Sequence, residues 1–424
     1  MENAPGWQRT ADRDWLNFHA PADNLPASRL GLLRSGLLLL TLALLPVYIF
    51  SSGRPQLVDG PLLILIIVQF LRRSSAEPFL RQNITTLLPL IIWIVLVNSV
   101  YFIFFPNEFG LWFKNAEFVY NLCIYICFSY LFFDLLKGSK NLWPLYLGIF
   151  LSFILLFTVK GYSEEELRSV LSFNNPNQLG YYALIIACLT VLLLHYKEKY
   201  LPDKTIFFWA DVIILFMAHF LALLSLSRGA LLGLLLLDIW FFPRLTRKIL
   251  LLLVPTVMLA LVVLIWRPAV IEQKLAGRPE REITQKEIQY EVRSRIFHQL
   301  SIMDGYQYLV GRGARGISFK EKARGIGEVH NIFGEIFRSY GLIGLGLLVF
   351  WLGRFIWRSR VLPGGLFIWG ALLLYNLTHY GLRFRFFWIL LGLVNVMLVL
   401  EWSAREEQPA PAPQLQEVEA AYRP

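Results

Sequence analysis

The stretch GEVHNIFGEIFRSYGLIGLGLLVFWLG, residues 327–353, combines a polar beginning with a long apolar run. A histidine and an asparagine, His330 and Asn331, stand where that run begins. A helix crosses a bilayer with about 20 predominantly apolar residues, so the run is long enough to span one. The stretch therefore predicts a membrane-spanning helix that opens on two polar side chains. Helix capping and interface packing would explain those side chains, and so would chemistry at a membrane surface.

The whole chain has the composition of a membrane protein. Of its 424 residues, 56% are hydrophobic and 17% are charged, whereas soluble domains average about 25% charged residues. Helices satisfy their own backbone groups in lipid, and the alternation typical of a β-barrel is absent, so we expect an all-α, polytopic fold. The three cysteines, Cys123, Cys127 and Cys188, lie in apolar runs without a metal-ligand spacing and are predicted to be small core residues.

Apolar runs separated by turn and charge signals predict about twelve spans. Their cores are 35–50, 57–71, 84–105, 116–136, 141–159, 179–196, 206–226, 230–243, 249–266, 332–353, 361–378 and 386–401. Short loops rich in lysine and arginine follow the even-numbered spans up to the tenth, and the positive-inside rule makes that side cytoplasmic. Both termini are then cytoplasmic, and His330 faces outward. We predict a cytoplasmic tail over 1–34, a membrane domain over 35–401 and a disordered cytoplasmic tail over 402–424.

One large loop, residues 267–329, dominates the predicted outer face. It contains twelve basic and eight acidic side chains, a net charge of +4, which fits a solvated mixed-charge face and an anion-binding site equally. An amphipathic helix is predicted within the loop, because five apolar residues recur on one helical face. They are Ile288, Val292, Ile296, Leu300 and Met303. Arg293 and Arg295 flank this stripe, which fits a helix on the membrane surface or one packed on the bundle.

Three polar sequences open helices that enter the membrane from the outer face. They are SFNNPNQLGYY (172–182), SLSRGALLG (225–233) and EVHNIFGEIF (328–337). Asn177, Ser227 and Asn331 are predicted to be N-caps. The first amides of a helix lack partners and the dipole is positive there, so helix beginnings bind anions such as phosphates. Arg228 lies at a turn between two spans, where it is either a snorkelling anchor or a functional charge.

Several histidines are candidates either for acid–base chemistry or for packing. His330 titrates near neutral pH, which suits a general base without proving that role. His219, in mid-span, is predicted to be packed or hydrogen-bonded, whereas His298 in the loop helix is a candidate second acid or base. His379 lies at another external mouth. The external side lacks the residue spacings of metal sites, so no metal is predicted, and the lone external acid Asp59 is predicted to be solvated.

Four stretches resemble the O-antigen ligase and polymerase superfamily of bacterial envelope glycosyltransferases. They are NPNQLG (175–180), SLSRGALLG (225–233), RSRIFHQLSIMDGYQYLVGRGARG (293–316) and HNIFGEIFRSYGLIG (330–344). The many-span layout with one large external loop between two late spans is also similar. The resemblance extends from about residue 165 to 350 and is only topological before that.

The resemblance implies an activity and a location. A glycan is transferred from an undecaprenyl-pyrophosphate-linked donor to a sugar hydroxyl of the lipid A–core acceptor. The reaction inverts the donor sugar, uses no metal or other cofactor, and takes place among membrane lipid on the periplasmic face of a Gram-negative inner membrane. No nucleic acid partner is predicted.

The resemblance also implies residue roles. Arg228 matches the arginine of the turn motif, and His330 matches the histidine that opens the late span. Arg295 matches the loop arginine before an aromatic residue, with Arg293 as a close alternative. The GRGARG segment adds Arg312 and Arg315 to the family pattern, and whether they bind pyrophosphate or core phosphates stays open. Further predicted substrate-binding residues are Asn177, Asn331 and His298.

Other functions fit the same sequence. An O-antigen polymerase and a protein O-oligosaccharyltransferase belong to the same superfamily, and the ligase is favoured because the single large basic loop suits a phosphate-decorated lipid acceptor. A transporter of a lipid-linked anion is the alternative without enzymatic activity. Such a transporter would place its site near the midplane between inverted repeats, whereas the basic residues here crowd one mouth.

Overall fold

The computed structural model describes residues 29–50, 55–71, 78–159, 171–173, 175–201, 206–241, 303–314 and 331–406. These residues form helices and no strands, so the all-α prediction is confirmed for this part of the chain. Six of the helices are long and apolar enough to cross a membrane. They are Pro78–Phe104, Gly110–Gly138, Pro176–Tyr200, Phe207–Ser225, Ile332–Ser359 and Arg385–Arg405. The chain is therefore a helical membrane protein.

Most of the described helices overlap predicted apolar runs, and the number of twelve spans stays a prediction. The helices are α1 (Arg29–Leu44), α2 (Asp59–Leu71), α3 (Pro78–Thr85), α4 (Leu88–Phe104), α5 (Phe109–Phe133), α6 (Trp143–Thr158), α7 (Pro176–Tyr200), α8 (Ile206–Ser225), α9 (Arg228–Phe241), α13 (Gly305–Val310), α15 (Ile332–Ser359), α16 (Gly365–Asn376) and α17 (Arg385–Glu406). Helix extends past both predicted limits of the membrane domain, since α1 begins before residue 35 and α17 ends after residue 401. The predicted span 249–266 lies outside the described residues, as does most of the loop 267–329.

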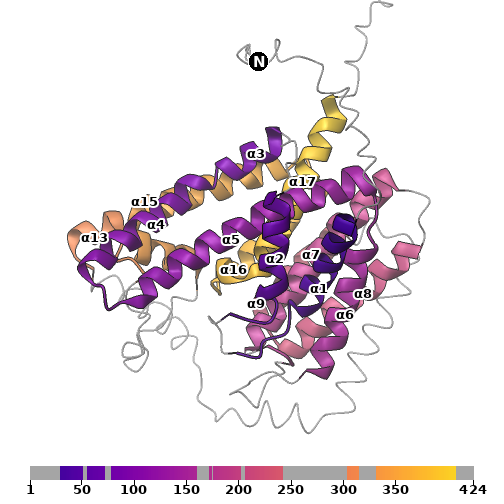
Figure 1. Ribbon diagram of the computed structural model, residues 1–424, viewed down its shortest axis with the longest axis horizontal. Coiled ribbons are helices and arrows are strands. Elements are labelled where there is room, and N and C mark those ends of the chain that lie inside the picture. Colours follow the sequence, from indigo (N-terminus) through magenta and orange to yellow (C-terminus); the bar gives the residue numbers. More distant parts are fainter. Residues whose placement is uncertain are drawn as a thin grey trace, which may run out of the picture.

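Two helices form the centre of the molecule. In their most apolar stretches, 94% of α7 and 83% of α17 is buried, far more than the 39% of α8. Helix α17 packs on α5 and α7, and α7 packs on α8 and α9. Figure 1 shows α4 and α15 lying side by side to one side of this centre, with α13 against α15. An apolar helix that other helices surround can be hydrophobic on every face, which is the pattern of α7.

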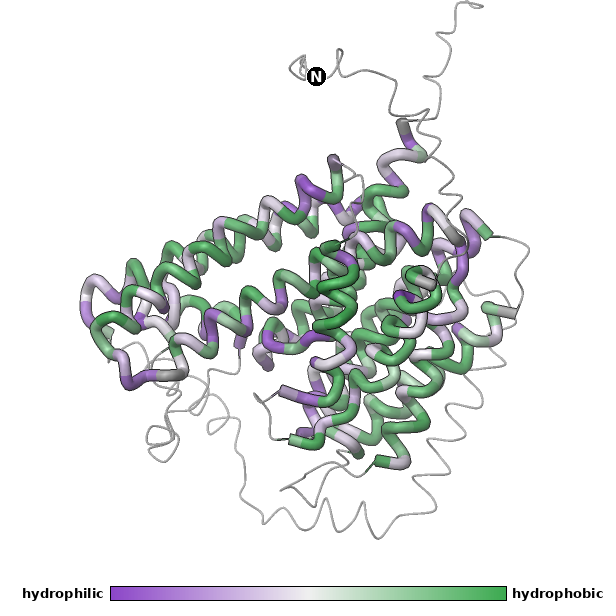
Figure 2. The backbone as a smooth tube through the Cα atoms, viewed as in Figure 1, coloured by the Kyte–Doolittle hydropathy of each residue, from purple (hydrophilic) through white to green (hydrophobic). Residues whose placement is uncertain are grey.

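The bundle has two polar ends, and Figure 2 shows apolar residues along the helices between them. We call the end at which α7, α9 and α15 begin and α16 ends the mouth. Ion pairs hold the opposite, far end: Arg34 contacts Asp134 at 2.7 Å, and Lys199 contacts Glu401 at 2.9 Å. Among the described residues, the basic side chains expected on one side of the membrane, such as Lys199, lie at the far end.

Candidate functional site

A tight turn presents Arg228 at the mouth. Helix α8 ends at Ser225 and α9 begins at Arg228, so two residues connect them. One of the two, Leu226, has a φ of +49°, a conformation that few side-chain-bearing residues adopt. The Arg228 side chain is exposed. The charge therefore lies on the surface of the mouth and is not buried between the helices.

The predicted caps are right at one of three helices. Asn331 caps α15, and its side-chain oxygen accepts hydrogen bonds from the amides of Phe333 at 2.8 Å and Gly334 at 3.1 Å. The prediction for Asn177 is wrong, because Asn175 caps α7 and accepts the Asn177 amide at 2.7 Å.

The physical reasons for the two corrections differ. Pro176 occupies the first position of α7, where proline is favoured, so the capping residue is the one before it. At α9, the predicted cap Ser227 has a buried hydroxyl without a hydrogen-bond partner in the described part of the chain. That hydroxyl therefore does not cap α9.

The end of α16 and the residues after it join the three helix beginnings. We call residues 375–384 the connecting segment. The Tyr375 hydroxyl donates a 2.9 Å hydrogen bond to the Asn177 carbonyl in the first turn of α7. The Asn331 side chain donates one of 3.0 Å to the Leu377 carbonyl. The beginnings of α7 and α15 therefore lie at neighbouring residues of one segment.

The beginning of α9 packs on the same segment. A Cβ added to Gly229 would lie 2.8 Å from Thr378 Oγ1 and 3.4 Å from the Tyr375 Cα, so only glycine fits there without displacement. Arg228 precedes that glycine. The two described residues that flank the predicted reaction centre, Arg228 and Asn331, are therefore positioned by residues 375–378, and the ring of His379 lies 4.8 Å from that of Tyr375.

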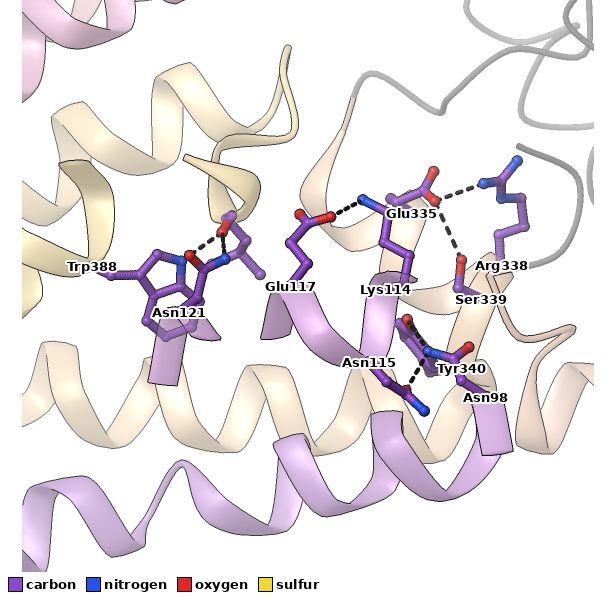
Figure 3. Close-up of polar contacts among 11 residues, drawn as sticks. Asn98, Lys114, Asn115, Glu117, Asn121, Glu335, Arg338, Ser339, Tyr340 and Trp388 are labelled. Carbon is purple, nitrogen blue, oxygen red and sulfur yellow. Dashed lines mark hydrogen bonds and ion pairs between the residues drawn. The ribbon is translucent and has the colours of Figure 1, made fainter. Parts of the chain in front are cut away.

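Two charged pairs lie beside the mouth, between α5 and the first turns of α15. Lys114 contacts Glu117 at 2.8 Å, and Arg338 contacts Glu335 at 2.6 Å. Figure 3 shows the pairs next to each other, with the Lys114 ammonium between the two glutamates. The Lys114 ammonium also lies 5.7 Å from the ring centre of Tyr380, in the connecting segment.

Neutral hydrogen bonds join the same elements below these charges. Asn98 of α4 donates to Asn115 of α5 at 3.0 Å and to the Tyr340 hydroxyl at 3.2 Å (Figure 3). Its side-chain oxygen accepts the Ala314 amide at 2.9 Å. One buried asparagine thus links α4, α5, α15 and the segment that follows α13.

The glycine-rich segment after α13 pairs with α15 through its backbone. Helix α15 is interrupted at Gly341, where the backbone is not helical. The Arg312 amide donates to the Arg338 carbonyl at 3.2 Å, and the Gly313 amide donates to the Ser339 carbonyl at 2.8 Å. These bonds satisfy carbonyls that the interruption leaves without helical partners, which lipid could not do.

No family model and no curated protein matches the chain. The family therefore stays an expectation from the resemblance, and the site is judged on its geometry alone.

The structure describes four of the nine predicted site residues. Arg228 and Asn331 lie at the mouth, and the Asn177 carbonyl lies there too. Arg312 is half-buried next to Arg338, with its backbone engaged in the pairing described above. The other five lie outside the described residues: His330, Arg293, Arg295, His298 and Arg315.

Two further predictions have clear outcomes. His219 is hydrogen-bonded as predicted: its Nε2 lies 3.1 Å from both Asp238 oxygens, and its Nδ1 lies 2.8 Å from the Leu215 carbonyl. The prediction that Asp59 is solvated is wrong, because Arg385 contacts it at 2.6 Å and the Tyr120 hydroxyl donates to it at 2.9 Å. Helices α2, α5 and α17 bring these groups together, which no local pattern indicates.

Sequence reasoning missed the charged pairs and, apart from His379, the connecting segment. A signal for the first was present, since Lys114, Glu117 and Asn121 are spaced by three and four residues in an apolar helix. Ionisable residues within such a helix are costly and often functional. The connecting segment has no comparable local signal, because its role depends on contacts with four other helices.

Proposed function

We propose that this chain is a glycosyltransferase of the O-antigen ligase type. Its donor is a glycan on undecaprenyl pyrophosphate, and its acceptor is a sugar hydroxyl of lipid A–core oligosaccharide. The observation that carries the proposal is the meeting of the three helix beginnings at residues 375–378, with Arg228 exposed beside them. Helix beginnings and a guanidinium both attract phosphate oxygens. A diphosphate is therefore a suitable ligand for this mouth.

In the proposed reaction, the acceptor oxygen attacks the anomeric carbon of the donor sugar. A bond forms between that oxygen and carbon, and the bond from the carbon to the pyrophosphate oxygen breaks with its electron pair. His330 takes the proton of the acceptor hydroxyl. Arg228 and a loop arginine, Arg295 or Arg293, stabilise the charge on the departing undecaprenyl pyrophosphate. One displacement of this kind inverts the anomeric centre.

The fold offers an orientation for this reaction. We propose twelve spans and a cytoplasmic N-terminus. In that topology the far end with its basic residues is cytoplasmic, and the mouth is periplasmic. The lipid tails of both substrates then stay in the outer leaflet while their sugars reach the mouth. Placing Arg228 beside the end of α16 suits this arrangement, since a charge at that height contacts headgroups and water.

The test is a reconstituted reaction with purified protein in detergent, lipid-linked donor, lipid A–core acceptor and EDTA. We expect a glycan-bearing product at an undiminished rate when EDTA is present. No product with the protein folded would contradict the proposal, and a rate that depends on added divalent cation would contradict its metal independence. In cells, deleting the gene should leave bare core and accumulated lipid-linked glycan. Core bearing a single repeat would identify a polymerase instead.

A transporter of a lipid-linked anion is the second candidate, and one observation favours it. His219, in the interior of α8, and Asp238, three residues before the end of α9, form a charged or hydrogen-bonded pair. Ionisable groups within membrane helices often serve transport. The same purified protein in vesicles distinguishes the two functions. Movement of the lipid-linked glycan between leaflets without a glycosidic product would favour the transporter.

A further inference from the structure

The two charged pairs beside the mouth are expensive features of apolar helices. Lys114 and Glu117 are three residues apart in α5, and Glu335 and Arg338 are three residues apart in α15. Charged side chains at membrane depth require partners, and they commonly mark a pathway or a binding site. Their position therefore calls for either a structural or a functional reason.

A structural reason is weak, because neither ion pair joins two helices. Each pair is formed within one helix, and the Ser339 hydroxyl adds a 3.3 Å hydrogen bond to Glu335 from the same helix. The links between α4, α5 and α15 are neutral and run through Asn98 and Tyr340. Replacing buried ion pairs by uncharged groups is often neutral for stability. The two ion pairs themselves therefore do not link the helices, although Lys114 also reaches the ring of Tyr380.

The pairs differ in access. The side chains of Lys114 and Glu117 keep 14% and 18% of their surface exposed, whereas those of Glu335 and Arg338 keep 6% and 5%. The α5 pair is therefore more accessible to a ligand than the α15 pair. In the α15 pair, the Arg338 Nε is buried without a hydrogen-bond partner among the described residues.

The balance of charge decides the class of ligand. Each of the two ion pairs is neutral, so a phosphate would have to displace a carboxylate from its partner. An uncharged sugar meets no such obstacle, because each hydroxyl both donates and accepts hydrogen bonds. The ring of Tyr380, which is buried, lies under the Lys114 ammonium and helps to hold it in place. We propose that the Lys114–Glu117 pair binds hydroxyl groups of an uncharged sugar of the substrate, with Glu335 and Arg338 positioning it.

This inference rests on the proposed function and names a part of its substrate site. The cluster lies next to the mouth, since the Glu335 amide bonds to the Asn331 carbonyl at 2.9 Å and Tyr380 follows His379 in the connecting segment. A sugar held by α5 at this place is beside the proposed reaction centre. The phosphates of the substrates are left to Arg228 and the loop arginines.

The experiment compares the double variant Lys114→Gln/Glu117→Gln with the wild type. Removing both charges together leaves neither one unpaired, so the variant should melt near the wild-type temperature. In the transfer assay we expect KM to rise about 10- to 100-fold for the substrate whose sugar is bound, either the lipid A–core acceptor or the lipid-linked donor. This is the effect of losing hydrogen bonds to charged groups, and kcat should change less than about threefold. The matched control is Arg34→Gln/Asp134→Asn, which removes a similarly exposed pair at the far end and should leave KM unchanged.

Binding is measured separately, by saturation-transfer NMR without donor lipid. The probes are core oligosaccharide freed of lipid and phosphate, and free O-antigen repeat oligosaccharide, which separate an acceptor sugar from a donor sugar. Binding of either probe by the wild type and its loss in the double variant would support the site. Binding that needs the phosphates, or that inorganic pyrophosphate displaces, would overturn the proposed site. An unchanged KM for both donor and acceptor in the folded variant would overturn it as well. Sugar binding without any transfer would support the sugar site and contradict the proposed glycosyltransferase function.

Discussion

At the scale of single residues, the proposed binding of phosphate at the mouth depends on the guanidinium of Arg228. Arg228 is exposed at the first position of α9, next to a glycine that packs on Thr378. An arginine presents a planar fork of donors that matches two phosphate oxygens, and a lysine offers only a point charge. The close packing of Gly229 fixes where that fork begins. The identity of this residue should therefore matter, and not only its charge.

We expect Arg228→Ala to lower the transfer rate by a factor of roughly 10² to 10³, the usual effect of removing one group that stabilises developing charge. Arg228→Lys should recover only a small part of the loss. The measurement is initial rate in the reconstituted reaction at matched protein levels. Arg360→Ala is the control, because that exposed arginine lies at the far end against Trp357. Wild-type activity in Arg228→Lys would reduce the residue to a simple charge.

His330 lies outside the described residues, next to the cap Asn331. A general base typically contributes a factor of about 10² to 10⁴. We expect His330→Ala to lower kcat by that factor while donor binding and protein level stay normal. His379→Ala, which changes the other histidine near the mouth, should cost much less. A larger loss of kcat in His379→Ala than in His330→Ala would identify His379 as the general base.

Asn331 has two roles that one pair of substitutions separates. Its oxygen caps α15, and its amide group bonds to the Leu377 carbonyl. Asn331→Ala should cost about 1 kcal/mol of stability through the lost cap. Asn331→Asp keeps the cap and loses the donor to Leu377, so we expect a near-normal melting temperature with reduced transfer. Full transfer by Asn331→Asp would show that the link to the connecting segment has no part in activity.

Residue-scale prediction succeeded where the cause is local. The cap at Asn331 follows from one asparagine before an apolar run, and the bonding of His219 follows from its place in mid-span. It failed at the caps of α7 and α9, and it failed where distant segments meet. Asp59 is paired with Arg385, which is 326 positions away, and Asn98 reaches a tyrosine 242 positions away. No pattern within a helix records such partners.

At the scale of elements, α15 is the helix whose interruption matters most. Gly341 has a φ of 66° and a ψ of −167°, a backbone conformation that is essentially restricted to glycine. Gly311, on the segment that pairs with it, has a φ of 87° and a ψ of −176°. The two glycines let the backbones approach so closely that a Cβ on Gly341 would lie 2.2 Å from the Leu309 carbonyl oxygen.

We expect Gly341→Ala to lower the free energy of unfolding by about 1 to 3 kcal/mol through backbone strain alone. The clash of the added Cβ should increase this loss. The measurement is thermal unfolding in detergent. Gly346→Ala is the control on the same helix, because no atom lies within 4 Å of its added Cβ. That variant should be neutral or slightly stabilising, since alanine favours helix over glycine by about 1 kcal/mol. Equal melting temperatures would show that the interruption adapts to a side chain.

The elements themselves were largely predictable from hydropathy. Crossing a bilayer takes a long apolar run, and that requirement is written locally in the sequence. The interruption in α15 was not predictable in the same way, because GLIGLG reads as a continuous apolar helix. Its cause is the backbone of residues 311–313, which comes from another part of the chain. That backbone can approach α15 so closely only because Gly311 and Gly341 have no side chains.

At the scale of the whole molecule, the separation of the two ends gives the fold its direction. The mouth contains Arg228, Asn331 and the two charged pairs, and the far end contains the pairs of Arg34 and Lys199. Exposed apolar side chains on α2, α4 and α9 lie between the ends, as lipid-facing surfaces do. A protein of this kind can act on a lipid-linked sugar only if the mouth faces the compartment that holds the acceptor.

Cysteine labelling tests that direction. In a background without Cys123, Cys127 and Cys188, we place one cysteine at Asn107, in the turn between α4 and α5, or at Asn141, before α6. Both positions are exposed and lie at opposite ends. In intact spheroplasts, a membrane-impermeant maleimide should label Asn107→Cys, and it should label Asn141→Cys only after lysis. The opposite result would turn the mouth to the cytoplasm and remove the proposed periplasmic transfer, while labelling of both from outside would contradict the fold itself.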